Sequence, residues 1–97
     1  MPKAYWITAY RKISDHDRLA AYAKLAPLAI AQFGGRYLVR GTPTAVFEAG
    51  LKERIVISEF PSMEKAIAAY GGRAYKEALQ VLGDAAVRDI RIIEGLE

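Results

Sequence analysis

The sequence predicts an α+β fold with the element order β-α-β-β-α-β, the split βαβ or ferredoxin-like pattern. Two observations predict it. Runs rich in aromatic and β-branched residues at 4–10 and 54–60 indicate strands, and apolar residues at helical spacing follow each of these runs. The chain has 97 residues and contains no repeat or long linker, so we expect a single domain, residues 1–97, with one antiparallel sheet and both helices on one face.

The first half of the chain should contain a strand, a helix and a second strand. After a strand at 4–10 and a connection at 11–13, Ser14 followed by an acid three residues later resembles a capping box. A stripe of apolar residues then predicts a helix: Leu19, Tyr22, Ala26, Ile30 and Phe33. Pro27 should kink this helix. Gly34-Gly35 should end it, and we expect one of the two glycines to have positive φ before a strand at 36–40.

The second half should contain a loop, a strand, two helical segments and a last strand. Residues 41–50 indicate a loop, and residues 54–60 a strand. Ser62 is a plausible N-cap for a helix whose stripe is Met63, Ala66, Ile67 and Tyr70. Gly71-Gly72 should interrupt this helix before a short one at 74–82, and the last strand is expected at 86–93.

Period-two alternation predicts which strand residues share a face. We expect one set to face the helices: Ile7, Tyr37, Val39, Ile55, Ile57, Ile90 and Ile92. The opposite set is Trp6, Thr8, Tyr10, Arg36, Leu38, Arg40, Val56, Ser58, Asp89 and Arg91. The assignment of the third strand is open, because Val56 and Phe60 would also suit a core.

The second of these faces contains aromatic and aliphatic side chains that no helix of the same chain would cover. Such a patch usually marks an interface or a ligand groove. We therefore predict a homodimer in which two sheets pack together through Trp6, Thr8 and Tyr10 and enclose a space. In that space Arg40 would contact Glu59, Asp89 or an anionic ligand, because an unpaired buried charge is costly.

Composition restricts the classes of partner. The net charge is +3 with a pI of about 9.3, and the charges are scattered, which does not favour a nucleic-acid surface. The chain contains no cysteine, which fits a reducing compartment, and we expect a cytoplasmic location. No apolar stretch is long enough for a signal peptide or a membrane span, so we expect no membrane partner.

Several stretches resemble domain-of-unknown-function family 1330. They are GGRYLVRG (34–41), EFPS (59–62), the tyrosine pair Tyr70 and Tyr75, and the dipeptide Arg88-Asp89. Asp15, Pro27, Glu48, Arg54 and the closing Glu94-Gly95 also fit the family pattern. The resemblance covers nearly the whole chain. It implies a small bacterial protein of the dimeric α+β barrel superfamily, alongside cofactor-independent monooxygenases, dye-decolorising peroxidases and muconolactone isomerase-type enzymes, and it implies no particular reaction.

The sequence also departs from the pattern of that family. Gly72 and Ala74 stand where a serine and a glutamate are common between the two tyrosines. Leu82 stands in place of an arginine, and Leu51 in place of a tryptophan. If those polar residues line a site in relatives, the site is altered in this protein.

Candidate site residues follow from the predicted faces and from side-chain chemistry. The ligand-binding candidates are Trp6, Thr8, Tyr10, Arg40, Ser58, Asp89 and Arg91. The catalytic candidates are His16, as the sole histidine, and Glu59; an exposed histidine and a structural salt bridge are the simpler interpretations of these two. No ligand spacing indicates a metal, and we expect no metal or organic cofactor.

Three functions are compatible with this sequence. The first is binding or conversion of a small oxygenated or anionic metabolite in the cavity of a dimeric barrel, and the second is a ligand-binding or structural dimer without chemistry. The third, an RRM-like RNA binder, is the least favoured, because Arg36-Tyr37-Leu38-Val39 lacks the glycine-aromatic spacing of RNP1.

Overall fold

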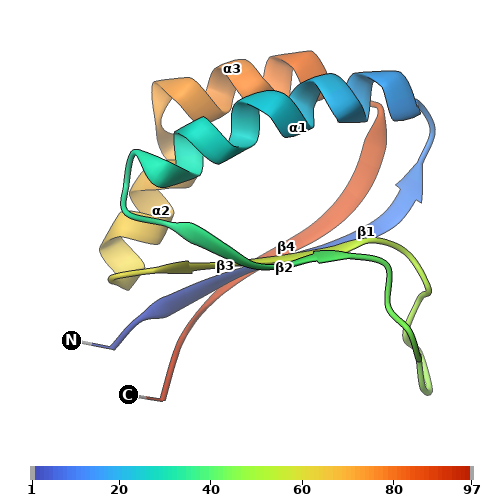
Figure 1. Ribbon diagram of the computed structural model, residues 1–97, viewed down its shortest axis with the longest axis horizontal. Helices are drawn as coiled ribbons and strands as arrows, with labels where there is room; N and C mark the ends of the chain where they lie inside the picture. Colours follow the sequence, from blue (N-terminus) through green and yellow to red (C-terminus); the bar gives the residue numbers. More distant parts are fainter. Residues whose placement is uncertain (1, 97) are drawn as a thin grey trace.

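Four antiparallel strands form one sheet, and three helices cover one of its faces (Figure 1). The computed structural model describes residues 2–96. The strands are β1 (Ala4–Ile13), β2 (Arg36–Gly41), β3 (Ile55–Phe60) and β4 (Ala86–Glu94); the helices are α1 (His16–Ala31), α2 (Met63–Gly71) and α3 (Arg73–Leu82). The sheet order is β2-β3-β1-β4, which confirms the predicted ferredoxin-like arrangement. No helix in residues 2–96 is long and apolar enough to cross a membrane.

The helix boundaries agree with the sequence prediction apart from one cap. Asp15, rather than Ser14, caps α1, because its side chain accepts a hydrogen bond from the Arg18 amide. The Ser14 hydroxyl instead donates to the Ala85 carbonyl at 3.1 Å, which joins the start of α1 to the end of α3. Ser62 caps α2 as predicted, and α1 continues through Pro27 to Ala31.

The turn between α1 and β2 requires both of its glycines, for different reasons. Gly34 has φ +80°, which confirms the expectation of a left-handed residue after α1. Gly35 has no such constraint, but a Cβ there would lie 2.5 Å from the Phe60 ring and 2.6 Å from Ile30. The end of α1 therefore lies directly against β3.

The predicted faces of β1 and β3 are wrong. Trp6, Thr8 and Tyr10 are buried beneath the helices, with Trp6 only 2% exposed, and Ser58 and Phe60 are buried on the same side. Ile7, Ile55 and Ile57 lie on the other face, because neighbours along a strand point to opposite sides. The predicted dimer face therefore cannot contain Trp6, Thr8 and Tyr10. For β4 the prediction is confirmed: Ile90 and Ile92 pack on the core.

A bulge in β2 separates two arginines that alternation places together. Tyr37 pairs with Ser58, but Val39 pairs with Ile57 and Arg40 with Val56, so Leu38 is an extra residue in β2. Tyr37 and Arg40 therefore both point toward the helices, whereas Arg36 lies opposite Glu59 on the other side of the sheet. The expectation that Arg36, Leu38 and Arg40 share a face is wrong, because it assumed an unbroken alternation.

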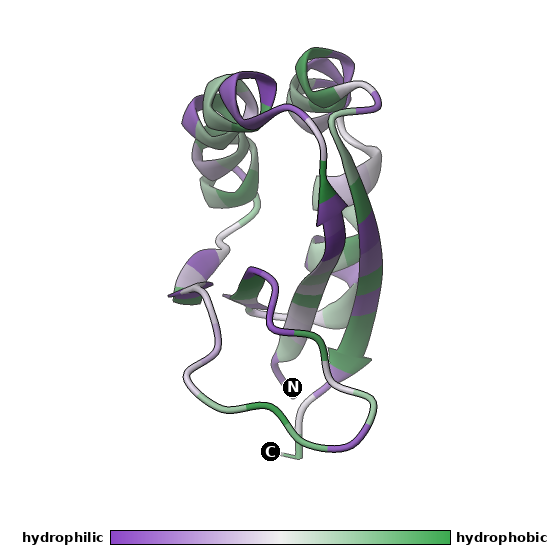
Figure 2. Cartoon of the chain, turned by 90° about the vertical axis from the view of Figure 1, so that its right-hand side faces the viewer, coloured by the Kyte–Doolittle hydropathy of each residue, from purple (hydrophilic) through white to green (hydrophobic). Residues whose placement is uncertain are grey.

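We name the two sides of the sheet by what covers them. The covered face packs against the helices and contains Trp6, Thr8, Tyr10, Tyr37, Arg40, Val56, Ser58, Phe60, Arg88, Ile90 and Ile92. The open face contains Tyr5, Ile7, Ala9, Arg36, Val39, Ile55, Ile57, Glu59, Val87, Asp89, Arg91 and Ile93. The loop 42–54 extends past the open face, away from the helices, and its far end has hydrophobic residues next to a hydrophilic stretch (Figures 1 and 2). Phe47 on this loop is 79% exposed.

Candidate functional site: an arginine-lined cavity

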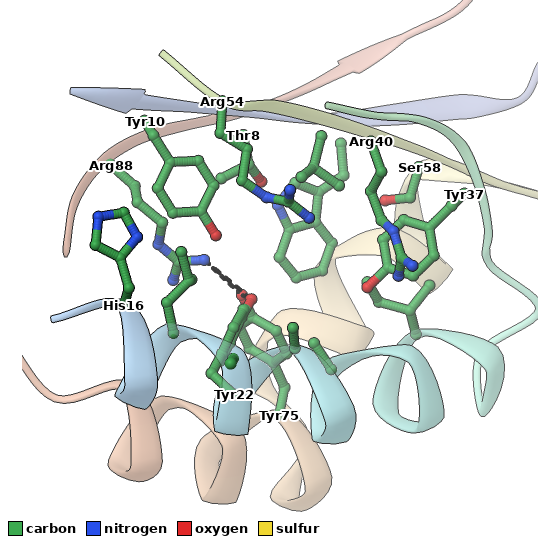
Figure 3. A pocket seen from close by; sticks show the side chains of 17 residues that line it. Thr8, Tyr10, His16, Tyr22, Tyr37, Arg40, Arg54, Ser58, Tyr75 and Arg88 are labelled. Carbon is green, nitrogen blue, oxygen red and sulfur yellow. Dashed lines mark hydrogen bonds between the residues drawn. The ribbon is translucent and has the colours of Figure 1, made fainter. Parts of the chain in front are cut away.

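A cavity of about 200 Å³ lies between α1 and the covered face of the sheet (Figure 3). Its sheet residues come from all four strands, and Tyr75 of α3 lies beside the residues of α1 at its helical wall. The lining residues are Trp6, Thr8, Tyr10, His16, Leu19, Ala20, Tyr22, Ala23, Ala26, Ile30, Tyr37, Arg40, Arg54, Val56, Ser58, Tyr75 and Arg88. Small side chains along α1 leave this space open.

Strand register arranges the sheet side of the cavity in rows. Tyr10 pairs with Arg88 on β4, and its amide donates to the Arg54 carbonyl at 3.0 Å, so Arg88, Tyr10 and Arg54 form the first row. The next row contains Ile90, Thr8, Val56 and Arg40, and the third contains Ile92, Trp6, Ser58 and Tyr37. On the covered face, cationic side chains therefore lie toward both edges of the sheet, with aromatic and small polar residues between them.

Arg88 is held against two tyrosine hydroxyls at one end of the cavity. Its Nη1 donates to Tyr22 Oη at 2.9 Å and to Tyr75 Oη at 3.4 Å, and the two hydroxyls hydrogen-bond each other. The guanidinium also lies 5.0 Å from the centre of the Tyr22 ring and 5.7 Å from that of Tyr10. These contacts fix Arg88 in place, and none of them neutralises its charge.

Both tyrosines of this cluster stay neutral at physiological pH. Burial raises the pKa of Tyr22, against the effect of the nearby Arg88 charge. Burial also raises the pKa of Tyr75, and the neighbouring Tyr22 raises it further. Two hydroxyl protons and the guanidinium N–H groups then share only two phenolic oxygens as acceptors. The cluster has more donors than acceptors, which suits an incoming anionic oxygen.

The other end of the cavity is formed by Arg40, Tyr37 and Arg54. The Arg40 guanidinium lies 4.8 Å from the centre of the Tyr37 ring, a cation–π contact, and burial raises the pKa of Tyr37 to about 12. Between the two ends, the indole Nε1 of Trp6 is buried and has no hydrogen-bond partner within residues 2–96.

The carboxylates of Glu59 and Asp89 lie on the open face instead. Glu59 accepts from Arg36 at 3.0 Å and lies 3.7 Å from Lys3, and Asp89 accepts from Arg91 at 3.1 Å and from Arg11 at 3.3 Å. No carboxylate is among the residues that line the cavity. Within residues 2–96, no cluster of three or more His, Cys, Asp or Glu residues could hold a metal ion.

The structure brings most of the predicted site residues together, on the face opposite to the one expected. Trp6, Thr8, Tyr10, Arg40 and Ser58 all line the cavity, and so does His16, the first residue of α1. Asp89 and Arg91 do not, because they pair with each other on the open face. Glu59 is on the open face as well, so it cannot act in the cavity; its partners are Arg36, Lys3 and Tyr5, and not the expected Arg40.

Sequence reasoning missed Arg88, Tyr22, Tyr75 and Arg54 as site residues. The helical spacing of Tyr22 predicts only a packing role, and Tyr75 packs as well, since its ring lies 5.0 Å from that of Trp6. For Arg88 a signal was present. It alternates with Ile90 and Ile92, which were correctly assigned to the covered face, and an arginine in a core-facing row needs an explanation.

Solved structures with the same fold include an oxygenase and proteins of unknown function. A protein of unknown function from Rhodopseudomonas palustris superposes with a TM-score of 0.74 at 16% identity, covering 99% of this chain and 84% of that one. SnoaB, a cofactor-independent oxygenase from Streptomyces nogalater, gives 0.70 at 6% identity over 100% and 96%. A dimeric ferredoxin-like protein from Thermobifida fusca gives 0.57 at 10% identity over 96% and 91%. At these identities the similarity establishes the fold.

The comparison with curated proteins gives no match. The comparison with protein families matches residues 3–96 to the domain of unknown function DUF1330, which confirms the resemblance carried by the motifs at 34–41 and 59–62. That match covers nearly the whole chain, including every residue that lines the cavity. The chain therefore belongs to the DUF1330 family.

Proposed function

We propose that this protein is a homodimer in which each subunit binds a small, flat organic anion in the cavity between α1 and the sheet. The observation that carries the proposal is the Arg88 cluster: a half-buried guanidinium fixed by Tyr22 and Tyr75, in a cavity whose lining contains no carboxylate. Arg88 supplies the charge, and the hydroxyl whose proton is not used in the Tyr22–Tyr75 hydrogen bond supplies one further donor.

The cost of leaving Arg88 unpaired supports an anionic ligand. A guanidinium withdrawn from water loses hydration that neutral phenols restore only in part. A carboxylate or enolate oxygen compensates for more of this loss, since charge-assisted hydrogen bonds are roughly twice as strong as neutral ones. An empty site is thus under electrostatic strain that a bound anion relieves.

Size and lining indicate the shape of the ligand. A cavity of about 150 Å³ accommodates benzene in a well-studied apolar case, so the 200 Å³ here accepts a single ring with small substituents. Trp6, Tyr10, Tyr22, Tyr37 and Tyr75 contribute aromatic surface around it. An aromatic or conjugated carboxylic acid satisfies both requirements.

The open face supports the homodimer. Ile7, Val39, Ile55, Ile57, Val87 and Ile93 form a β-branched surface there, with Val87 and Ile93 more than half exposed. A groove of about 570 Å³ separates this face from the loop 42–54. Exposed apolar surface of this extent usually marks an interface. A second sheet would cover it, and the cavity of each subunit would remain on the far side, under its own helices.

Calorimetric titration with benzoate tests the ligand proposal. We expect the parent protein to bind benzoate and to reject the neutral analogue benzamide, since only benzoate neutralises Arg88. Arg88→Gln should weaken benzoate binding at least about tenfold. The matched control is Arg91→Gln, which removes an arginine from the open face of the same strand and should leave benzoate binding unchanged.

Two further outcomes decide the proposal. Arg88→Lys keeps the charge and loses the guanidinium fork, so it should bind benzoate more weakly than the parent and more tightly than Arg88→Gln. If Arg88→Gln retains the parent's melting temperature and binds benzoate as the parent does, the proposal is wrong. Equal binding of benzoate and benzamide would contradict it as well.

Conversion of the bound acid is a second candidate function, favoured by the position of His16. This imidazole lines the cavity and lies beside Arg88 at its edge (Figure 3). It could take a proton from a carbon next to a carbonyl whose oxygen is held by the Arg88 cluster, and return it to that oxygen. Phenylpyruvate, whose enol absorbs in the ultraviolet, tests this: His16→Gln should slow enol formation, and equal rates would exclude the role.

The structure does not favour RNA binding of the RRM type. An RRM presents aromatic side chains on an open sheet face. Here Trp6 and Tyr10 are buried beneath the helices, and Tyr5 is the aromatic side chain that remains on the open face.

A further inference from the structure

Five of the eight arginines lie outside the cavity. Of these, Arg11, Arg18, Arg36 and Arg91 are each within ion-pair distance of a carboxylate, and Arg73, at the start of α3, is exposed to solvent and has none within residues 2–96. The three that line the cavity, Arg40, Arg54 and Arg88, have no such partner within residues 2–96. The cavity thus concentrates positive charge that no part of the described chain neutralises.

This charge lies at two separate places. Arg88 and Arg54 occupy the same row of the sheet on either side of Tyr10, which puts their Cα atoms two strand spacings, or roughly 10 Å, apart. Arg40 projects from the neighbouring row on β2, beyond Arg54 as seen from Arg88. Figure 3 shows Arg88 at one end of the cavity and Arg40 at the other, with the Arg54 side chain between them.

The two places also differ in how the guanidinium is held. Arg88 is fixed by hydrogen bonds to Tyr22 and Tyr75. Arg40 is exposed, and its guanidinium lies over the Tyr37 ring. The bulge at Leu38 is what brings Arg40 to this face at all. A single carboxylate at Arg88 would leave both Arg54 and Arg40 without a counter-charge.

We propose that the ligand is a dianion with acidic groups at opposite ends, one held by the Arg88 cluster and the other by Arg54 and Arg40. This inference rests on the proposed function and adds the second anionic group to it. A flat aromatic dicarboxylic acid has the required charge, and its rigid ring would lie over Tyr10 between the two arginine positions. The spacing favours groups on opposite sides of the ring over groups on adjacent carbons.

The three benzene dicarboxylates measure this spacing directly. We expect terephthalate, with its carboxylates opposite each other, to bind at least about tenfold more tightly than benzoate. Phthalate, with its carboxylates adjacent, should show no such advantage, and isophthalate should fall between them. Isothermal titration at fixed ionic strength gives the dissociation constants, and the ratio of the benzoate constant to the terephthalate constant is the quantity to compare between variants.

Arg54→Gln and Arg40→Leu should each reduce this ratio several-fold, and the double variant should bring it close to one. Arg36→Leu is the matched control: it removes an arginine from the open face of the same strand as Arg40 and should leave the ratio unchanged. Arg40 is exposed, so its variant is expected to fold; the melting temperature of each variant checks this.

Failure of this inference differs from failure of the proposed function. If benzoate and terephthalate bind equally and both require Arg88, the second anionic group is excluded, while the anion site stands. If terephthalate binds more tightly but neither Arg54→Gln nor Arg40→Leu changes the ratio, the assignment of the second position is wrong. If none of the acids binds, or binding is indifferent to Arg88, the proposed function itself fails.

Discussion

Among the residues that the structure describes, the charged side chains are ion-paired on the open face of the sheet and lack ion-pair partners on the covered face. On the open face each carboxylate lies between cations: Glu59 contacts Arg36 and Lys3, and Asp89 contacts Arg91 and Arg11. On the covered face, Arg88 contacts only neutral hydroxyls and aromatic rings. The same sheet therefore presents neutralised charge on one side and unneutralised positive charge on the other.

This difference indicates what each face can receive. Paired charges around β-branched residues suit a protein surface of the same kind, because such a contact leaves no ion unpaired. A cluster of donors without acceptors suits a small anion, because the ligand supplies what the chain lacks. A substitution on the open face should therefore change dimer formation and leave the cavity intact, and a substitution in the cavity should leave the dimer intact.

Ile57→Asp should cause the largest effect, by placing a charge in the apolar part of the open face. A two-fold axis would introduce the carboxylate twice, so we expect a loss of roughly 6 kcal/mol in association free energy, enough to give monomers at micromolar concentration. Light scattering measures the mass. Ile67→Asp on the exposed side of α2 is the control and should remain dimeric. A parent protein that is monomeric at this concentration would contradict the dimer proposal.

Tyr75→Ala should cause the largest loss of folding stability from the covered face. Tyr75 is 1% exposed and contacts the rings of Trp6, Tyr22 and Tyr70, so its removal should cost about 3–5 kcal/mol. Tyr75→Phe keeps the ring and loses only the hydroxyl, and should cost about 1 kcal/mol, since Tyr22 still accepts from Arg88. Urea unfolding compares the two. Equal losses would show that the ring does not stabilise this face.

The glycine pair that leads from α1 into the sheet should give intermediate effects. Gly35→Ala forces a Cβ against Phe60 and Ile30 and should cost about 1–3 kcal/mol. Gly34→Ala adds a side chain at φ +80° and should cost about 1 kcal/mol. Thermal unfolding ranks the variants. A Gly34 variant that melts like the parent would contradict the left-handed assignment.

The smallest effect should be the pH dependence of the open face. The Arg36 hydrogen bond lowers the pKa of Glu59 below its ordinary 4.5, and Tyr5 and Lys3 act in the same direction. A carboxylate with a lowered pKa stabilises the folded state above its ordinary pKa, and this contribution disappears as the pH falls through the lowered value. Glu59→Gln should therefore reduce the loss of stability in acid, measured as melting temperature against pH. Glu77→Gln, an exposed acid on α3, should not.

The element order and most helix ends could be predicted from the sequence because their signals are local. The Ser62 cap and the left-handed glycine after α1 depend on a few neighbouring residues, and both are confirmed. The faces of β1 could not be predicted in the same way. Trp6 and Tyr10 on one side and Ile7 on the other are all apolar, because this sheet has hydrophobic surface on both faces, and alternation then fails to distinguish them.

The cavity could be predicted in part, because residues that share a strand face stay together when the face is inverted. Trp6, Thr8 and Tyr10 share a strand face, as alternation predicts, but that face is the covered one. The position of Arg40 was not predictable, since the bulge at Leu38 exists only through the pairing of β2 with β3. Alternation with Ile90 and Ile92 places Arg88 on the covered face, but its partners Tyr22 and Tyr75 could not be predicted, because these contacts join α1, α3 and β4 in a way that sequence spacing does not encode.

The burial of Trp6 has an optical consequence. The chain contains one tryptophan, and it forms part of the cavity wall, with its ring against Tyr75 and Phe60. The intrinsic fluorescence of the protein therefore originates beside the proposed ligand. A ring or a charge bound beside the indole would alter this emission without any label, so the fluorescence of the untagged protein would report whether the cavity is filled.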